Sequence, residues 1–344
     1  MPKCVAIATG GTGGHIIPAQ DVGDQLVNTC KIIFIGVGLL KNNFINGLHR
    51  ELYDIDGANF SVGILQCSRK IYRGFLQAKK ILVDKKVSHV IGFGSYHTLP
   101  VILAAIYLKI PYTLIEPNVM PGKINRFFSR WANETLIHFE PAIRYLSGNV
   151  EKIFFNFKSF PEIISKCDAR DYFGLDREVN TLLVFGGSQG AMAINDIVVK
   201  SATYLKNKYQ IIHFTGSQSN VKAMYNEIGI RNFVDNFSSD IEKAWVASDL
   251  AICRSGAGAI REMLIYEKPA ILIPYPNATD GHQEKNGRFI SDEIGGGICI
   301  NQHDLTTEVL IETINSINLK GMSRALLLYK NRDMRKTIVE ALNL

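Results

Sequence analysis

Short apolar runs alternate with stretches of helical periodicity along most of this chain. Apolar runs of about five residues between polar or glycine-rich segments are typical of buried strands, and apolar residues spaced three and four apart are typical of helices. Their regular alternation indicates parallel sheets built from strand–helix–strand units. The expected strands cover residues 3–8, 31–36, 88–92, 111–115, 134–137, 181–185, 209–213, 249–253, 269–273 and 296–300. The expected helices cover residues 15–28, 69–85, 98–108, 121–131, 191–204, 219–227, 239–247, 257–266 and 283–292.

The pattern starts twice, and each start is a strand that runs into a glycine cluster. The 344 residues are enough for two domains of about 150 each. The stretch 155–165 contains Pro161 and has no clear periodicity, so we place a linker there. The predicted fold class is α/β, with two Rossmann-like, doubly wound parallel-sheet domains that face a cleft. We expect a first domain over 1–157, a second over 166–325, and a terminal helix over 326–344 that packs back on the first domain.

Four glycine-rich loops each follow an expected strand. They are Gly10–Gly14, Gly92–Ser95, Gly186–Gly190 and Ser255–Gly258. Glycine lets the backbone approach a ligand closely, and the N-terminus of the next helix offers unpaired N–H groups and a positive dipole end. Tight strand–helix turns also use glycine for structural reasons alone. A glycine-rich loop recurs after four strands, and this recurrence favours anion binding. Each domain has two of these loops, which suggests that each domain binds a diphosphate ligand.

Known phosphate and metal motifs fit these loops poorly. The first loop lacks the final glycine of the dinucleotide fingerprint, and the second strand ends in Gly36 rather than in a carboxylate for a ribose. There is no G-x-x-x-x-G-K-[ST] motif for a nucleoside triphosphate. Asp54-Ile55-Asp56 has the letters of a metal-binding D-x-D motif, but it lies away from the loops and alternation alone explains it. We therefore expect a metal-independent reaction that needs no cofactor, with fixed dipoles stabilising a leaving diphosphate.

Composition is that of an ordinary globular protein, with 47% hydrophobic and 20% charged residues. The longest apolar stretch, Leu99–Leu108, is half the length that a membrane span needs. The first strand follows the start of the chain at once, so we expect no signal peptide. The six cysteines show neither disulfide nor metal-site spacing, which favours a reduced, cytosolic protein.

Basic and apolar residues gather in two stretches of the first half. In the first, Ile71 and Phe75 recur at helical spacing beside a run of basic residues, and in the second, Phe127 and Trp131 alternate with basic residues. The basic residues of the first stretch are Arg69, Lys70, Arg73, Lys79, Lys80, Lys85 and Lys86. A solvated basic face over a core stripe is one interpretation, and a surface that sits on anionic lipid is the other. No nucleic-acid recognition motif accompanies the charge, so we expect no nucleic-acid partner.

Several motifs, in this order, resemble the peptidoglycan N-acetylglucosaminyltransferase family of the MurG type. They are Gly10-Gly11-Thr12-Gly13-Gly14-His15-Ile16-Ile17-Pro18, Gly92-Phe93-Gly94-Ser95-Tyr96, Glu116-Pro117-Asn118, Gly186-Gly187-Ser188-Gln189-Gly190-Ala191, Cys253-Arg254-Ser255-Gly256-Ala257 with Glu262, and 280–286. The resemblance spans nearly the whole chain. It implies two GT-B domains and inverting transfer of N-acetylglucosamine from UDP-N-acetylglucosamine to the C4 hydroxyl of the muramyl sugar of lipid I. It also implies peripheral binding at the cytoplasmic face of the plasma membrane, in the company of other cell-wall synthesis proteins.

The resemblance implies that the second domain binds the donor. Glu262 would accept hydrogen bonds from the ribose, although a carboxylate favoured by the helix dipole explains it equally well without the family. Phe237 and Ser238 would lie near the uracil, and Gln283 near the sugar hydroxyls. The remaining donor-binding residues would be Thr12, Gly13, Gly14, Asn118, Ser188, Gln189, Gly190, Ser255, Gly256 and Ala257.

The same resemblance places the acceptor on the first domain. His15, Glu116 and Asn118 are the candidate catalytic residues, and His15 is a candidate to deprotonate the acceptor hydroxyl. A histidine at a helix N-terminus is otherwise a cap or a packed polar residue. The acceptor-binding residues would be Gly13, Gly14, His15, Gly94, Ser95 and Tyr96.

Three positions depart from the family pattern. Pro117 stands where glutamine is usual, Ser159 where an arginine is usual, and His282 replaces one glutamine of a pair. These changes leave two alternatives open: a GT-B transferase with a different acceptor, and a membrane-bound homologue that has lost catalysis.

Overall fold

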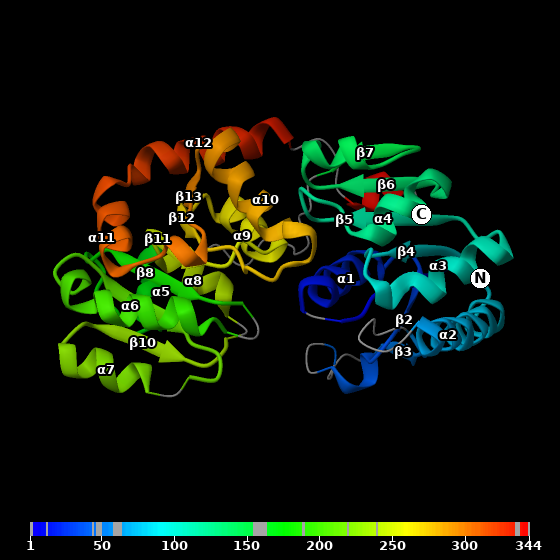
Figure 1. Ribbon diagram of the computed structural model, residues 1–344, viewed down its shortest axis with the longest axis horizontal. Coiled ribbons are helices and arrows are strands. Elements are labelled where there is room, and N and C mark those ends of the chain that lie inside the picture. The colour runs from blue at the N-terminus through cyan, green and yellow to red at the C-terminus, as the bar shows by residue number, and fades with distance from the viewer. Residues whose placement is uncertain are drawn as a thin grey trace. The chain divides into compact units, whose positions relative to one another are not determined.

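The computed structural model describes residues 3–11, 13–42, 45, 50–57, 64–153, 164–187, 190–218, 220–238, 240–333 and 338–342. The chain divides into two compact units, unit 1 with residues 1–158 and 334–344 and unit 2 with residues 159–333. Each unit is built on one sheet, and the strand pairs that the structure describes are parallel (Figure 1). The predicted fold class, two Rossmann-like parallel-sheet domains, is confirmed. Most of the predicted linker, 155–165, lies outside the described residues.

The sheet of unit 1 has the strand order β3-β2-β1-β4-β5-β6-β7 in the described ranges. Its strands are β1 Cys4–Ala8, β2 Lys31–Gly36, β3 Glu51–Asp54, β4 Val87–Gly92, β5 Tyr112–Glu116, β6 Glu134–Ile137 and β7 Val150–Lys152. Its helices are α1 Gly13–Leu26, α2 Ile64–Asp84, α3 Leu99–Leu108, α4 Lys123–Phe128 and α13 Ile338–Leu342. Short 3-10 turns lie at η1 Leu39–Lys41, η2 Tyr96–Thr98, η3 Ser129–Trp131 and η4 Glu140–Tyr145.

Helices cover both faces of this sheet, as the alternation of side chains along the strands requires. Val5 and Ile7 of β1 belong to a core with residues of α1 and α13, whereas Ala6 and Ala8 belong to a core with residues of α2, α3 and α4. Because successive strand residues point to opposite faces, the three helices α2, α3 and α4 form one layer. The segment 338–342 packs in unit 1, while α12, Leu319–Asp333, belongs to unit 2.

The sheet of unit 2 has the order β10-β9-β8-β11-β12-β13 in the part that the structure describes. Its strands are β8 Thr181–Phe185, β9 Gln210–Phe214, β10 Asn232–Asp235, β11 Leu250–Cys253, β12 Ala270–Leu272 and β13 Gly297–Cys299. Its helices, besides α12, are α5 Lys166–Tyr172, α6 Met192–Leu205, α7 Val221–Ile228, α8 Ile241–Ala247, α9 Ala257–Tyr266, α10 His282–Arg288 and α11 Thr307–Ser316. Shorter segments are η5 Thr279–Gly281, the π-turn η6 Phe289–Ile294 and η7 Gln302–Asp304. One core joins α6, α7 and α11 to the sheet, and α8 packs on β8 between α5 and α9.

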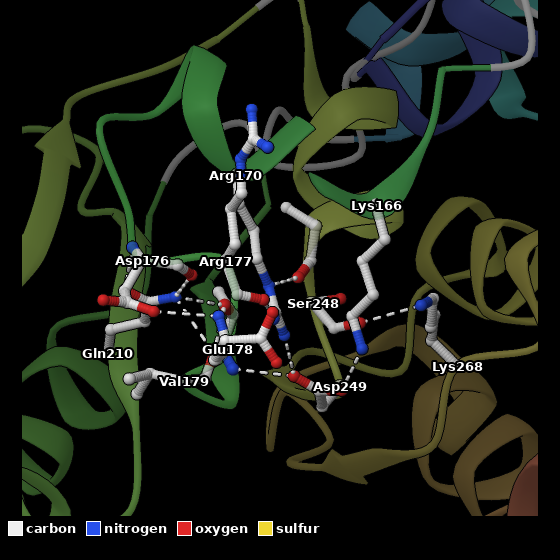
Figure 2. Close-up of polar contacts among 12 residues, drawn as sticks. Lys166, Arg170, Asp176, Arg177, Glu178, Val179, Gln210, Ser248, Asp249 and Lys268 are labelled. Carbon is white, nitrogen blue, oxygen red and sulfur yellow. Dashed lines mark hydrogen bonds and ion pairs between the residues drawn. The ribbon is translucent and has the colours of Figure 1, made fainter. Parts of the chain in front are cut away.

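An ion network closes the amino end of the unit 2 sheet, opposite the glycine loops. Asp249, just before β11, forms ion pairs with Lys166 and Arg170 of α5, and it accepts a hydrogen bond of 2.7 Å from the backbone N–H of Thr181 (Figure 2). Lys268 donates to the carbonyl of Ser248 at 2.8 Å beside this group. The network ties the first helix of unit 2 to the starts of β8 and β11, so it serves stability rather than ligand binding.

Lys268 makes the stability of unit 2 depend on pH. Burial, helped by the positive charge of Lys166, lowers the pKa of Lys268 to about 8. An unfolded lysine has a pKa of about 10.4, so the unfolded chain binds more protons between pH 8 and 10. Below pH 8 the buried lysine is charged and lowers the free energy of unfolding by its full amount. Above pH 8 the lysine loses its proton in the folded state, so this loss of stability becomes smaller. We expect the free energy of unfolding of wild type relative to Lys268→Met to increase from pH 8 to 10 in denaturant titrations. Parallel pH curves for the two proteins would contradict this.

Candidate functional site

The strand orders place the four glycine loops in two pairs. In unit 1 the chain runs outward from β1 to β3 and returns to β4, so β1 and β4 flank a topological switch point. The loops Gly10–Gly14 and Gly92–Ser95 follow these two strands. In unit 2, β8 and β11 flank the switch point, and Gly186–Gly190 and Ser255–Gly258 follow them. Ligands of open α/β sheets bind at such points, outside the carboxyl ends of the strands.

His15 lies in the first turn of α1, directly after the first loop of unit 1. Its side chain is half-buried, and the hydroxyl of Thr9 donates to its carbonyl oxygen at 3.0 Å. The side chain of Asn42 donates to the carbonyl of Gly11 at 3.0 Å, which fixes the loop before the helix. The structure thus holds His15 at the carboxyl edge of the sheet, while Thr12 lies outside the described residues.

A second histidine packs on the same loop. His97, in η2, lies so close that a Cβ atom on Gly11 would come within 3.1 Å of its Nδ1, and Gly11 has a φ of 88°. Burial lowers the pKa of His97. The contact explains why the loop needs glycine there, and it joins the two loops of the pair. His97 directly follows the motif Gly92–Tyr96, but no sequence pattern marked it as a candidate.

Glu116 ends β5 as a fully buried carboxylate. It accepts hydrogen bonds from the backbone N–H of Asn118 at 2.9 Å, from the backbone N–H of Gly122 at 2.9 Å and from the side chain of Asn125 at 3.0 Å. The side-chain amide of Asn118 donates to it as well, at 3.1 Å. Burial raises the pKa of Glu116, and these bonds oppose the rise. The carboxylate therefore organises the loop that presents Asn118.

The other acceptor candidates belong to the loop after β4. Gly94 has a φ of 68°, and a Cβ there would come within 2.4 Å of the amide nitrogen of Asn125. Ser95 and Tyr96 follow at the start of η2 and are half-buried. Asn125 thus joins this loop to the Glu116 loop.

In unit 2 the loop after β11 leads into the N-terminus of α9. Ser255 is fully buried, and its hydroxyl donates to the carbonyl of Gln283 at 2.8 Å. Its own carbonyl accepts from the side chain of Asn286 at 3.1 Å. Gly258 has open space where a Cβ would lie, and Gly256 meets only the end of Gln283, at 3.9 Å. Together with Ala257, these residues present the first backbone N–H groups of the ten-residue helix α9 to an open surface, as an anion site requires.

Glu262 lies on α9, and its carboxylate is held from the neighbouring helix. The indole Nε1–H of Trp245 donates to its Oε2 at 2.8 Å. Burial raises the pKa of Cys253, at the end of β11, and the negative charge of Glu262 adds to this rise. The negative charge of Glu262 thus acts on the carboxyl end of β11, the strand that leads into the glycine loop.

The remaining donor candidates border the same edge of unit 2. Phe237 has 56% of its surface exposed, and Ser238 accepts from the backbone N–H of Asp240 at 2.9 Å before α8 begins. Gly190 has a φ of 72°, and a Cβ there would lie 2.8 Å from the carbonyl of Thr215. Gln283 accepts from the backbone N–H of Tyr275 at 2.9 Å. Ser188 and Gln189 lie outside the described residues.

Arg254 and His282 take part in local hydrogen bonds. The guanidinium of Arg254 donates to the carbonyl of Pro274 at 3.1 Å and to the side chain of Gln302 at 2.7 Å. These bonds join the ends of β11, β12 and β13. The ring of His282 bonds the carbonyl of Thr279 at 2.8 Å, at the start of α10.

The layer of α2, α3 and α4, together with η3 directly after α4, exposes aromatic rings beside basic groups. Tyr72 and Tyr107 are 61% and 62% exposed, and the ammonium of Lys79 lies 4.4 Å from the ring centre of Tyr107. Phe127 and Trp131 are each 53% exposed, with their ring centres 5.4 Å apart. The guanidinium of Arg130 lies over both rings, at 5.4 and 5.2 Å.

The structure refines the predicted membrane residues. Phe75 is half-buried against the core, so Tyr72 and Leu76, the latter 44% exposed, present the apolar surface of α2 instead. Arg73 forms an ion pair with Asp56 at 3.1 Å. The exposed basic residues of α2 for which no such pair is found among the described residues are Arg69, Lys70 and Lys80. None of the helices in the described ranges is both long and apolar enough to cross a bilayer.

The D-x-D letters of Asp54-Ile55-Asp56 fall at the edge of the unit 1 sheet. Asp54 accepts from the backbone N–H of Gly38 at 2.6 Å, Ile55 is buried, and Asp56 pairs with Arg73. Both carboxylates therefore have structural partners on β3 and its surroundings, away from the switch point.

Comparisons with known proteins agree with this geometry. Residues 5–137 match the model of the glycosyltransferase family 28 N-terminal domain, and residues 181–340 match that of the C-terminal domain. A UDP-N-acetylglucosamine–N-acetylmuramyl-(pentapeptide) pyrophosphoryl-undecaprenol N-acetylglucosamine transferase of Protochlamydia amoebophila is 37% identical, and the match covers 99% of this chain and 95% of that protein. A protein of the same name from Chlamydia muridarum is 37% identical, over 89% of this chain and 87% of its own.

Solved structures give the same result. The crystal structure of MurG from Acinetobacter baumannii superimposes with a TM-score of 0.78 at 27% identity, covering 99% of this chain and 98% of that one. The glycotransferase of kitacinnamycin, at 15% identity and a TM-score of 0.74, shares the fold. The sequence relatives and the solved structures together show that the chain belongs to the MurG family of N-acetylglucosaminyltransferases and is a UDP-sugar glycosyltransferase of the GT-B architecture.

Proposed function

We propose that this chain transfers N-acetylglucosamine from UDP-N-acetylglucosamine to the muramyl sugar of lipid I and so forms lipid II, a step of peptidoglycan synthesis. The C4 hydroxyl of the muramyl sugar attacks C1 of the donor sugar with inversion. The bond from C1 to the UDP oxygen breaks, UDP leaves, and the hydroxyl proton passes to a base on the enzyme. The observation that carries the proposal is the near full-length likeness to transferases named for this reaction, across both family 28 domains.

We assign the donor to unit 2. Its diphosphate would accept hydrogen bonds from the backbone N–H groups of Ser255–Gly258, at the positive end of the α9 dipole. The ribose hydroxyls would donate to the carboxylate of Glu262, and Gln283 would meet the sugar. Phe237 and Ser238 border the uracil in this assignment, and Ser188, Gln189 and Gly190 complete the loop on the other side of the switch point.

We assign the acceptor to unit 1. His15, in the first turn of α1, is the candidate base for the acceptor hydroxyl. Gly13, Gly14, Gly94, Ser95 and Tyr96 would surround that sugar, as the pair of loops at the switch point suggests. Asn118 would be positioned through Glu116, whose carboxylate is already used by four donors and therefore suits a structural role better than proton transfer.

Charge on the leaving diphosphate would be stabilised by fixed dipoles. The backbone N–H groups at the start of α9 need no reorganisation during the reaction, which is the condition for effective electrostatic stabilisation. The carboxylates of Asp54 and Asp56 already have partners of their own, Gly38 and Arg73. We therefore propose a reaction without a divalent metal.

A lipid-linked acceptor requires the enzyme to work at a membrane surface. The layer of α2, α3 and α4 suits peripheral docking on anionic lipid, because exposed rings can enter the interface while basic residues meet the head groups. Phe127, Trp131 and Tyr72 would supply the rings, and Arg69, Lys70 and Lys80 the charge. This surface would face the cytoplasmic leaflet, where UDP-sugars are available.

Replacing Glu262 tests the donor assignment. A hydrogen bond to a charged group contributes about 1.5–3 kcal/mol, so Glu262→Ala should weaken UDP binding about tenfold or more in calorimetric titrations. Glu262→Gln keeps an acceptor for the indole of Trp245 and controls for loss of that contact. Glu227→Ala, at an exposed position on α7, is the matched control and should bind UDP normally. Unchanged UDP affinity in a folded Glu262→Ala protein would remove the assignment.

A further inference from the structure

Trp245 is buried with none of its surface exposed, and its indole N–H donates, in the part of the chain that the structure describes, to a carboxylate that we assign to the donor site. Its ring packs edge-on against Phe185, at the end of β8, with ring centres 5.7 Å apart. Its Nε1–H donates to Oε2 of Glu262 at 2.8 Å. A buried indole N–H needs a partner, and α8 and α9 pack side by side so that the partner is this carboxylate.

We propose that Trp245 is a positioning residue that orients the Glu262 carboxylate for the ribose of the uridine nucleotide, so that the site selects a ribonucleotide over its 2′-deoxy analogue. The inference rests on the proposed donor role of Glu262. The indole N–H donates to one carboxylate oxygen, Oε2, and this bond limits the orientations that the carboxylate can take.

Orientation in advance matters because a glutamate has several rotatable bonds. A free glutamate would lose side-chain freedom when the nucleotide binds, and that loss would reduce the affinity. A rigid, buried donor on the neighbouring helix removes most of this freedom before binding. Sites built to bond a hydroxyl also reject an analogue that lacks it, because the oriented carboxylate then loses its partner.

A purely structural role for Trp245 makes a different prediction. If the ring only fills the core beside Phe185, Trp245→Phe would disturb the whole edge of unit 2. UDP and 2′-deoxy-UDP would then lose affinity by the same factor. If the N–H orients Glu262, Trp245→Phe would reduce the advantage of UDP over 2′-deoxy-UDP, because the bonds from the ribose hydroxyls are weakened and 2′-deoxy-UDP has one hydroxyl fewer.

Calorimetry with four proteins and two ligands separates these outcomes. Wild type, Trp245→Phe, Glu262→Ala and the double variant are each titrated with UDP and with 2′-deoxy-UDP. We expect Trp245→Phe to bind UDP roughly 3- to 10-fold more weakly, as for an oriented hydrogen bond to a charged group, with a smaller loss for 2′-deoxy-UDP, which keeps only its 3′ hydroxyl. We expect the double variant to match Glu262→Ala, because Trp245 acts through Glu262.

Equal losses for the two ligands, or a further loss of UDP affinity in the double variant, would overturn the inference. The proposed function fails separately. If Glu262→Ala itself leaves UDP affinity unchanged, the donor assignment falls. If Glu262→Ala weakens UDP binding while Trp245→Phe retains the full preference for UDP, only the role of Trp245 falls.

A second measurement leaves Trp245 in place, in case Trp245→Phe does not fold. The chain has two tryptophans, so Trp131→Phe leaves Trp245 as the only indole fluorophore. In this background we expect soluble UDP to change the emission of Trp245, and we expect Glu262→Ala to abolish that change. Emission that responds to UDP equally with and without Glu262 would overturn the inference.

Discussion

Replacing His15 with alanine is expected to lower kcat about 10²-fold or more, which is the usual scale for a lost acid–base group. His15 lies in the first turn of α1 at the switch point of unit 1, next to the loop that we assign to the acceptor sugar. Without it, no side chain on that turn can take the proton from the attacking hydroxyl. The donor binds unit 2 in this assignment, so the affinity for UDP should hardly change.

Initial rates at saturating donor and acceptor, together with calorimetric UDP binding, measure the two quantities separately. His303→Ala is a suitable control because its side chain is 78% exposed, on η7 of unit 2. It should leave both kcat and UDP binding unchanged. Normal turnover in folded His15→Ala protein would contradict the role as a base. It would instead support the alternative interpretation, in which His15 is a packed polar residue.

Reversing the charge of Arg69, Lys70 and Lys80 is expected to release the enzyme from anionic vesicles. Each basic residue near such a surface contributes about 1 kcal/mol, so removing three attractions alone weakens binding roughly 100-fold, and the new negative charges add repulsion. The three side chains are exposed on α2, and Arg73 is left unchanged because it pairs with Asp56. Sedimentation with phosphatidylglycerol vesicles measures the loss.

The matched control reverses Lys200, Lys222 and Lys320, which are exposed on unit 2 and change the net charge by the same amount. We expect that control to stay on the vesicles. High salt should mimic the reversal on α2, since exposed charges are screened beyond about 8 Å at physiological ionic strength. Turnover of a short, water-soluble acceptor should survive the reversal. A triple variant of α2 that still sediments with vesicles would refute the docking surface.

The central strands and helices could be predicted because their sequences carry strong patterns. β1, β5 and β8 are buried along their whole length, and β2 and β4 are buried over their last three residues. Apolar residues dominate these buried stretches, and the predicted bounds of the five strands agree with the structure to within one residue. The edge strands β3, β7 and β10 were missed. They are three or four residues long, and most of their residues are half-exposed, so their sequences resemble loops.

The positions of the glycine loops could be predicted because a turn between strand and helix is local. Long-range contacts could not. Trp245 and Glu262 are 17 positions apart on different helices, and His97 meets Gly11 across two loops, so neither contact has a local signature. On α2, spacing alone did not fix which apolar side chains turn outward. The helix directs Phe75 to the core and leaves Tyr72 and Leu76 exposed.

A transfer assay tests most directly whether this chain moves N-acetylglucosamine onto lipid I. Purified protein is incubated with labelled UDP-N-acetylglucosamine and a lipid I analogue, once with magnesium and once with EDTA, and the lipid product is analysed. We predict the labelled disaccharide lipid in both arms, because in the proposed reaction backbone N–H groups rather than a metal would stabilise the departing diphosphate. Product only in the magnesium arm would contradict the metal-independent reaction. If neither arm gives the disaccharide lipid, the proposed transfer to lipid I is contradicted, whether or not the protein binds UDP.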